Sequence, residues 1–495
     1  MTYQNLDPLD SAFITLEVPS APLHIGVILE LDMCDERDPR ERFETIKENI
    51  AARLHEIPVL TQRILRTPFD LAWPVYAEDP EFDINAHVVR RAVPSPGGEA
   101  ELDALVGRVM SRELVPDRPL WELNVIEGLA DGRAAVIMKI HHALADGVSG
   151  AATFARLFDI TTDVRKPEPL VAVAPAPPLP TPLEMLSRTA GEILRRPGAL
   201  VEVVTAGMER AAEIFERIAQ TGDADVHEFG AHQPSILEAQ RTSINGTPSH
   251  SKKFNRLRID LADVKSAARL RGASVTDFVM ATVSGGLTKL FEARGEVLER
   301  DLIAFVPINV RRHGSEGELG NQISAMLLAL RTDLENPEDR IRAISAAQSL
   351  VADQQREQSA RLLMNLANAA GPTLTSAAGR TLAALELYDH LPPIANVVVS
   401  SVPGPTIPLY LSGHRVATAA PLGPLMAGLA LNITVFGYVD QLEYGLLGCA
   451  RHVPELDQLR DFIAEEADYF LKTPVDLEAP IVAETSATMI GTTRT

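Results

Sequence analysis

A chain of 495 residues is too long for one ordinary hydrophobic core and predicts two domains. Hydrophobic residues make up 46% of the chain and charged residues 23%, which is the balance of a folded globular protein rather than a disordered one. The 46 basic and 67 acidic residues give a net charge of −21, which argues against general nucleic-acid binding and against a polybasic membrane anchor.

Residues 1–164 are predicted to form a first domain that mixes short strands and helices. Apolar residues alternate or cluster in short runs where we expect strands, and recur at helical spacing where we expect helices. The expected strands cover residues 24–31, 123–127 and 134–140. The expected helices cover residues 39–54, 102–114 and 148–158. A polar turn at 130–133 joins the last two strands as a hairpin.

A composition shift separates this domain from the rest of the chain. Seven prolines lie between residues 165 and 182, and at that density they exclude a helix or a central strand. We therefore expect a linker with connecting helices over 165–253, including a helical pattern over 183–219. The second domain is expected over 254–478, and the tail 479–495, rich in Ser, Thr and Ala, is predicted to be disordered.

The second domain is also predicted to be of the α/β kind. A helix is expected over 274–290, and strands are expected over 255–259, 301–310, 325–330, 396–400 and 431–438. The uncharged run 416–439 is long enough to cross a bilayer, but Pro421, Gly423 and Pro424 interrupt it, so we expect a buried turn and strand. The N-terminus lacks the basic start and apolar core of a signal peptide. Cys34 and Cys449 are expected to be ordinary thiols in a reducing cytosol.

The segment 141–147, His-His-Ala-Leu-Ala-Asp-Gly, follows directly on the strand expected over 134–140. A histidine takes up and returns a proton near neutral pH, so one fixed at the end of a rigid strand is a candidate general base. Because strand side chains alternate, His141 and His142 are expected on opposite faces, one toward a cleft and one packed into the domain. That geometry disfavours a metal ion shared by His141, His142 and Asp146.

A purely structural role for the histidines and a nucleophilic triad are the two alternatives for this segment. The chain contains no Gly-x-Ser-x-Gly elbow, and neither cysteine has a recognisable catalytic setting. General-base catalysis by one of the two histidines is therefore the favoured hypothesis.

The pattern His-His-x-x-x-Asp-Gly resembles the signature of CoA-dependent acyltransferases and of the condensation domains of peptide synthetases. Further segments make the chain resemble the bacterial wax ester synthase/acyl-CoA:diacylglycerol acyltransferase family, and they run in order through most of the chain. These segments are Leu9-Asp10-Ser11-Ala12-Phe13 with Leu16-Glu17, Pro22-Leu23-His24, Pro119-Leu120-Trp121, Thr276-Asp277-Phe278-Val279-Met280-Ala281, Leu319-Gly320-Asn321, Val402-Pro403-Gly404-Pro405, and Gly423-Pro424-Leu425 through to Leu431-Asn432-Ile433-Thr434-Val435.

The resemblance implies two chloramphenicol-acetyltransferase-like domains joined by the long linker, with an active-site channel between them. It makes His142 the general base and gives His141 a supporting role by packing or hydrogen bonding. It also implies that Asp146, which precedes the turn residue Gly147, forms a structural ion pair with an arginine. Arg311 is our candidate partner, and Arg312 is nearly as good.

Three residues are candidates for binding the substrate or the oxyanion: Thr276, Asn309 and Asn321. The family block usually opens with asparagine where this chain has Thr276. A threonine hydroxyl also donates a hydrogen bond, but the side chain is shorter and stiffer, so a changed rate or acceptor preference is expected. The backbone N–H groups of the helix start are unaffected by this difference.

The resemblance further implies transfer of a long-chain acyl group from acyl-CoA, a co-substrate, to the hydroxyl of diacylglycerol or of a fatty alcohol. No covalent intermediate, resident cofactor or metal is expected. We expect a cytoplasmic protein in peripheral contact with a membrane or lipid-droplet surface. The alternatives are another CoA- or carrier-dependent condensation-type acyltransferase, and a non-catalytic lipid-binding relative. The chain has no fused carrier domain, and its histidine motif is intact.

Overall fold

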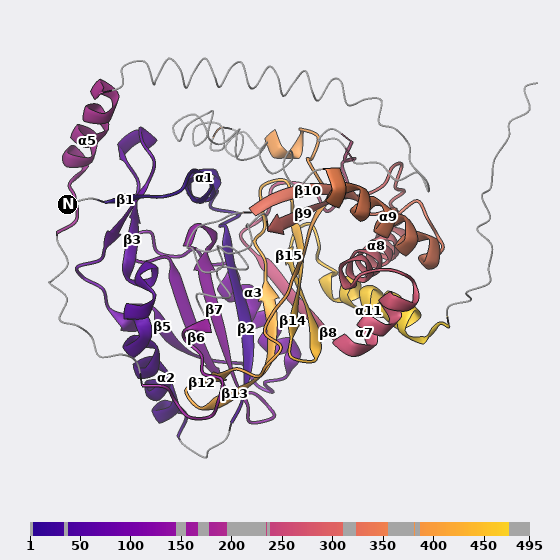
Figure 1. The fold of residues 1–495 in the computed structure, drawn as a ribbon, viewed down its shortest axis with the longest axis horizontal. Coiled ribbons are helices and arrows are strands. Elements are labelled where there is room, and N and C mark those ends of the chain that lie inside the picture. The colour runs from indigo at the N-terminus through magenta and orange to yellow at the C-terminus, as the bar shows by residue number, and fades with distance from the viewer. Residues whose placement is uncertain are drawn as a thin grey trace, which may run out of the picture.

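The computed structural model describes residues 3–33, 38–144, 155–166, 178–195, 234, 238–309, 323–354, 381 and 387–474. Two six-stranded sheets lie side by side at the centre of the molecule (Figure 1). A three-stranded sheet of β1 (Gln4–Asn5), β4 (Val75–Glu78) and β3 (Gln62–Leu65) lies beside the first of them.

The first six-stranded sheet carries the histidine motif and has the order β12-β13-β2-β7-β6-β5. Its strands are β2 (His24–Asp32), β5 (Val88–Ala92), β6 (Trp121–Glu127), β7 (Ala134–His141), β12 (Tyr410–Leu411) and β13 (His414–Leu422). Every residue of β7 is buried, with Val136 and Met138 in one core and Ala135 and Ile137 in another. Cores on both faces explain why β7 reads as a continuous apolar run.

Two strands of this sheet come from the C-terminal part of the chain. β13 pairs antiparallel with β2, and β12 pairs antiparallel with β13. Residues 410–422 thus complete a sheet whose other strands all lie before residue 142. The domain division at residue 254 was based on composition and does not predict that β12 and β13 join the first sheet. Strand pairing can bring together residues that are distant in sequence.

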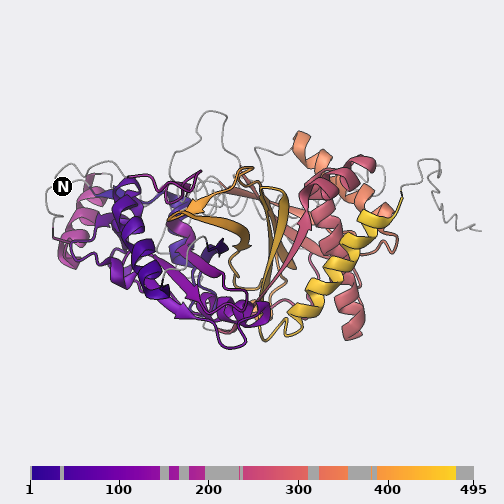
Figure 2. The same cartoon turned by 90° about the horizontal axis from the view of Figure 1, so that it is seen from below.

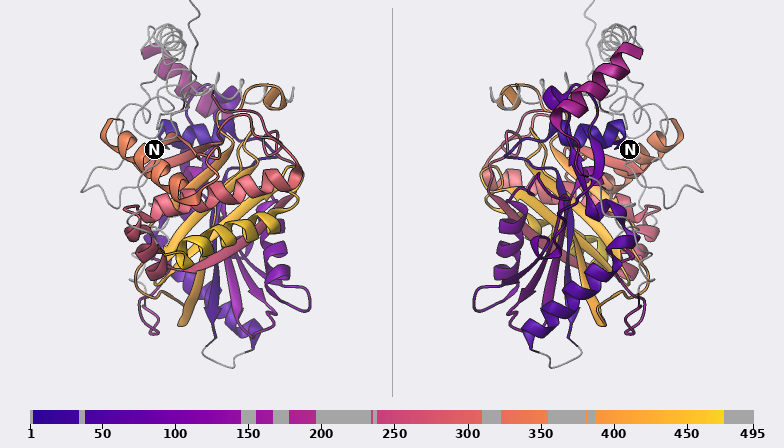
Figure 3. Two further views of the ribbon diagram at one scale, coloured as in Figure 1. Left: turned by 90° about the vertical axis from the view of Figure 1, so that its right-hand side faces the viewer. Right: turned by 90° about the vertical axis from the view of Figure 1, so that its left-hand side faces the viewer.

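The second sheet has the order β10-β9-β11-β14-β15-β8 and is mixed parallel and antiparallel. Its strands are β8 (Lys252–Asp260), β9 (Ile303–Asn309), β10 (Ile323–Ala329), β11 (Val397–Val402), β14 (Leu431–Tyr438) and β15 (Gln441–Cys449). Four helices cover the face turned away from the first sheet: α7 (Leu261–Leu270), α8 (Val275–Arg294), α9 (Pro337–Gln354) and α11 (Leu456–Lys472) (Figure 2). Seen from that side, α8 and α11 lie across the strands (Figure 3).

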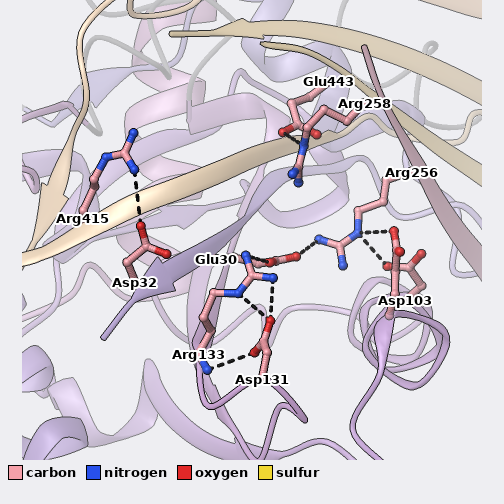
Figure 4. A network of polar contacts seen from close by, with 10 residues as sticks. Glu30, Asp32, Asp103, Asp131, Arg133, Arg256, Arg258, Arg415 and Glu443 are labelled. Atoms are coloured by element: carbon pink, nitrogen blue, oxygen red, sulfur yellow. Dashed lines mark hydrogen bonds and ion pairs between the residues drawn. The ribbon is translucent and has the colours of Figure 1, made fainter. Parts of the chain in front are cut away.

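The two sheets share a core that is organised around helix α3 (Glu99–Met110). Leu102, Leu105 and Val106 of α3 pack with residues of both sheets, among them Ile137 of β7 and Phe254 of β8. A network of ion pairs lies beside this core (Figure 4). The two halves of the molecule are therefore joined by an apolar core and by charges.

Most elements expected from the sequence are present with small shifts at their ends. The helix expected over 102–114 is α3, which begins at Glu99 because the Gly98 N–H donates to the Glu101 carboxylate at 2.9 Å, as in a capping box. The uncharged run 416–439 forms most of β13 and the whole of β14, as expected. Among the predicted helices, residues 148–154 and 196–219 lie outside the described residues, as does the tail 479–495. Helix α5 (Pro182–Arg195) is the described part of the pattern over 183–219.

Candidate active site

Strand β7 delivers both histidines to a short helical turn. β7 ends at His141, and the turn η5 (His142–Leu144) begins at the next residue. Since the strand stops there, the alternation that would place the two histidines on opposite faces does not extend to His142. Both side chains are buried, His141 with 1% and His142 with 9% of its surface exposed. We refer to His141 and η5 together as the histidine turn.

Main-chain hydrogen bonds fix the histidine turn to the two neighbouring strands. The N–H of His142 donates to the carbonyl of Leu23, directly before β2, at 2.8 Å. The N–H of His141 donates to the carbonyl of Leu120, directly before β6, at 2.9 Å. Leu120 belongs to the Pro-Leu-Trp segment singled out in the sequence. That segment therefore supports the histidines through its backbone.

Trp121, the last residue of that segment, is packed in the core. Its indole N–H donates to the carbonyl of Leu60 at 2.7 Å, and its ring stacks on His87 with 4.6 Å between centroids. Phe82 stacks on His87 as well, at 5.1 Å and an interplanar angle of 14°. Burial lowers the pKa of His87. These contacts anchor Trp121 in the core of the first sheet.

A phenylalanine ring covers the imidazole of His142. Phe13 lies in α1 (Pro8–Leu16), and its ring stacks on His142 with 4.1 Å between centroids and an interplanar angle of 18°. Stacked rings at this distance are in full van der Waals contact. Phe13 belongs to one of the segments that resemble the family, but nothing in the local sequence predicts its contact with His142.

Tyr76 holds the histidine turn from the three-stranded sheet. Its hydroxyl, on β4, donates to the carbonyl of Ala143 at 3.2 Å. Burial, and to a lesser extent the charges of Asp10 and Asp7, raise the pKa of Tyr76. The phenol therefore remains protonated and able to donate at any physiological pH.

The side chain of His141 faces a carboxylate. Its Nδ1 accepts the N–H of Ala143 at 3.1 Å, which leaves the ring proton on Nε2. Nε2 lies 3.5 Å from Glu17 Oε2, and the other oxygen of Glu17 lies 3.8 Å from Nε2 of His24. Burial, followed by the charges of Lys139, His141 and Lys252, holds the pKa of His24 well below its usual value. His141 is thus bonded within the histidine turn through Nδ1 and faces Glu17 through Nε2.

Two buried lysines at the C-terminal end of α3 were not expected from the sequence. Lys139 of β7 donates to the carbonyls of Val109 and Arg112, and Lys252 of β8 donates to that of Met110 at 3.1 Å. Burial lowers the pKa of Lys139 to about 7 and that of Lys252 to about 8. Both amino groups bind carbonyls at the C-terminal end of α3. In the sequence, Lys139 stands as the single charge in an apolar run, and this is the one sign that could have indicated a buried lysine.

Several predicted site residues are placed only in part. Asp146, Gly147, Arg311, Arg312 and Asn321 lie outside the described residues. Asn309 is the last residue of β9, where only its backbone is described. Thr276 is half-buried in the first turn of α8. Its neighbour Asp277 caps that helix, with Oδ2 accepting the N–H of Ser274 at 2.7 Å.

Two further observations concern ligands and membranes. Within the described ranges, no group of three or more His, Cys, Asp and Glu side chains is arranged to hold a metal ion. No helix in the same part of the chain combines the length and apolar character needed to cross a bilayer.

Comparison with known proteins places the chain in a family. Residues 6–279 match the family model of the wax ester synthase/diacylglycerol acyltransferase catalytic domain, and residues 319–469 match that of the WS/DGAT C-terminal domain. A "probable diacylglycerol O-acyltransferase" of Mycobacterium tuberculosis is 30% identical over 464 residues, which is 92% of this chain and 93% of that protein. Another from the same organism is 30% identical over 455 residues, 91% of this chain and 95% of its own length.

Solved structures share this fold. The wax ester synthase/diacylglycerol acyltransferase from Marinobacter aquaeolei VT8 is 25% identical, with a TM-score of 0.66 over 94% of this chain and 98% of that one. The first condensation domain of the calcium-dependent antibiotic synthetase shares the fold at 17% identity, with a TM-score of 0.55 over 95% of this chain and 97% of that one.

Family models and relatives together define an enzyme, an acyltransferase, whose two-domain fold is shared with a condensation domain. The chain belongs to the wax ester synthase/diacylglycerol acyltransferase family. The fold class expected from the sequence is confirmed.

Proposed function

We propose that this enzyme transfers a long-chain acyl group from acyl-CoA to the free hydroxyl of diacylglycerol, forming triacylglycerol, and that a long-chain fatty alcohol can replace diacylglycerol to give a wax ester. The observation that carries the proposal is the position of His142, held at the end of a buried strand with its backbone bonded to Leu23 and its ring stacked on Phe13. The names of the relatives support diacylglycerol as the acceptor.

In the proposed reaction, the imidazole of His142 removes the hydroxyl proton as the acceptor oxygen attacks the thioester carbonyl carbon. The new C–O bond gives a tetrahedral oxyanion. When this intermediate collapses, the C–S bond breaks, and the imidazolium returns the proton to the departing CoA thiolate. A thioester is already activated, so no acyl-enzyme is required, and the protein supplies position and charge stabilisation.

The remaining predicted residues have supporting roles in this proposal. Thr276, Asn309 and Asn321 are the candidates for binding the substrate or the oxyanion. Asp146 pairs with Arg311 and, together with Gly147, shapes the segment after the histidine turn. The lipid acceptor reaches the channel from a membrane or lipid-droplet surface on which the enzyme sits peripherally.

Release of free thiol from palmitoyl-CoA tests the acceptor. Purified enzyme is supplied with a diacylglycerol, with hexadecanol, or with no acceptor, and the lipid product is identified by mass spectrometry. We expect thiol release and triacylglycerol with the diacylglycerol, and a slower reaction with hexadecanol. Release that occurs with neither lipid alcohol would show that the acceptor is of another class.

The His142→Ala variant tests the base. We expect kcat to fall by about 10²–10⁴-fold, the range in which positioned general bases contribute. His250→Ala, which removes an exposed histidine, is the control and should keep the wild-type rate. Circular dichroism and thermal unfolding establish that both variants are folded. A folded His142→Ala protein with the wild-type rate would show that His142 is not the base.

A further inference from the structure

We propose that Phe13 is a positioning residue for acyl transfer, whose ring holds the imidazole of His142 in the orientation that proton transfer requires. This inference rests on the proposed role of His142 as the general base. It assigns a function to a residue of helix α1.

Backbone bonds alone do not orient the base. The hydrogen bonds to Leu23, Leu120 and Tyr76 all involve main-chain groups of the histidine turn. Such bonds fix the Cα position of His142, whereas the direction of its ring nitrogens depends on the two side-chain torsions. A ring stacked at 4.1 Å and 18° holds the plane of the imidazole, because tilting the imidazole out of this plane would drive one of its edges into the phenyl ring.

Phe13 can act in this way because α1 is itself held in place. The residues on either side of Phe13, Ala12 and Ile14, are each 6% exposed, and Ile14 packs in the core that includes Met138 and Ile140 of β7. Just before α1, the N–H of Leu6 donates to the carbonyl of Pro74, next to β4, at 2.9 Å. The phenyl ring is therefore presented to His142 by a helix attached to the same core as the strand.

A second phenylalanine–histidine stack in the described part of the chain serves as a comparison for the Phe13 and His142 pair. Phe82 stacks on His87 at 14°, close to the 18° of the Phe13 and His142 pair. His87 in turn stacks on Trp121 and bonds to a backbone carbonyl through Nδ1 at 2.9 Å. Loss of either phenyl ring removes one phenylalanine–histidine stack, but only Phe13 contacts the proposed base.

The test compares Phe13→Leu, Phe13→Tyr and Phe82→Leu in the full chain, with kcat and KM for palmitoyl-CoA as readouts. For Phe13→Leu we expect kcat to fall at least about tenfold with KM within about twofold, because misplacement of a reacting group by about 1 Å can reduce a rate by about 10²-fold. Phe13→Tyr keeps the aromatic face and should retain most of kcat. Phe82→Leu should lower the thermal midpoint while leaving kcat within about twofold, since it leaves the base in place.

Three results would overturn the inference. The first is an unchanged kcat in folded Phe13→Leu while His142→Ala is inactive. The second is a raised KM with kcat retained, which would make Phe13 a substrate-lining residue. The third is an equal fall of kcat in the Phe13 and Phe82 variants. If Phe13→Leu does not fold, Phe13→Met, which fills the space without a planar face, is measured in its place. A wild-type rate in His142→Ala would instead remove the proposed role of His142 as the base, on which this inference rests.

Discussion

At the scale of single residues, one hydroxyl links the three-stranded sheet to the histidine turn. Replacing Tyr76 by phenylalanine removes the donor to the Ala143 carbonyl and keeps the ring. We expect the free energy of unfolding to fall by about 1 kcal/mol, the usual net value of one such bond. We also expect kcat to fall about three- to tenfold, because the turn that carries His142 is loosened. Steady-state kinetics and urea unfolding measure the two effects.

Tyr444→Phe is the matched control for this change. Tyr444 is fully buried in β15 of the second sheet, and its hydroxyl lies 3.2 Å from Thr282 Oγ1. The Tyr444→Phe variant therefore also loses one hydrogen bond. A similar loss of stability is expected, with kcat unchanged. If both variants lose the same fraction of kcat, the effect of Tyr76 is one of general stability.

The sequence singles out His142 as the proposed base, but it does not predict the groups around it. A pair of histidines at the end of an apolar run, with Asp146 and Gly147 at fixed distances, is a local pattern. Phe13 and Tyr76 reach the turn from other elements, and their contacts exist only because α1 and β4 pack there. Nothing local to a phenylalanine or a tyrosine predicts which histidine or carbonyl it will touch.

At the scale of elements, the close approach of β13 and β15 depends on a glycine. A Cβ atom placed on Gly445 would lie 1.8 Å from the carbonyl oxygen of Pro421, a backbone atom that cannot move aside alone. Gly445→Ala is therefore expected to lower the free energy of unfolding by about 1–3 kcal/mol or more, as overpacking does. Thermal and urea unfolding measure the loss.

Gly437→Ala in the neighbouring strand β14 provides the comparison. A Cβ at Gly437 would have its nearest neighbour, the backbone nitrogen of Gly404, at 3.8 Å, which is ordinary contact. That variant should be neutral or slightly stabilised, since alanine restricts the unfolded chain. Equal stability of the two variants would contradict the steric explanation.

Elements with a strong local pattern were predicted well. β7 is apolar except for Lys139 and His141, and β14 over Leu431–Tyr438 has the limits expected from its alternation. The end of α3 was placed four residues too far along, at residue 114 instead of Met110. Lys139 and Lys252 bind the carbonyls at that end, and such tertiary contacts leave no periodic signal.

At the scale of the whole molecule, Arg256 of β8 in the second sheet forms ion pairs with acidic side chains of the N-terminal half (Figure 4). It contacts Glu30 of β2, lies 3.2 Å from Asp103 of α3 and lies 3.3 Å from Glu99. Burial raises the pKa of Asp103 to about 7, opposed by Arg256 and reinforced by Glu99 and Glu30. Three acidic side chains thus share one buried guanidinium.

This arrangement predicts how stability depends on pH. Between the ordinary carboxyl pKa of 3.8 and about 7, the folded protein keeps a proton on Asp103 that the unfolded chain has released. The contribution of Asp103 to the free energy of unfolding therefore falls as pH rises through this window, by at most about 1.4 kcal/mol per pH unit. Asp103→Asn lacks this dependence, so it should gain stability relative to wild type between pH 5 and pH 8.

Urea unfolding at the two pH values measures this difference. Glu99 contacts the same arginine, but its side chain is 63% exposed. Glu99→Gln therefore controls for the loss of one negative charge beside Arg256. A stability difference between Asp103→Asn and wild type that stays constant, or that changes in the opposite direction, would show that Asp103 is ionised across the window.

The sequence by itself determined the α/β class, the strand over residues 134–140 that leads into the histidine pair, and the family to which the chain belongs, because these depend on local periodicity and on short motifs. The tertiary structure decided that residues 410–422 complete the first sheet, that α3 joins the two halves, and that α1 and β4 hold the histidine turn. These features arise when the chain buries apolar surface shared by distant segments. Burial of that kind is a property of the packed molecule, and no single stretch of sequence records it.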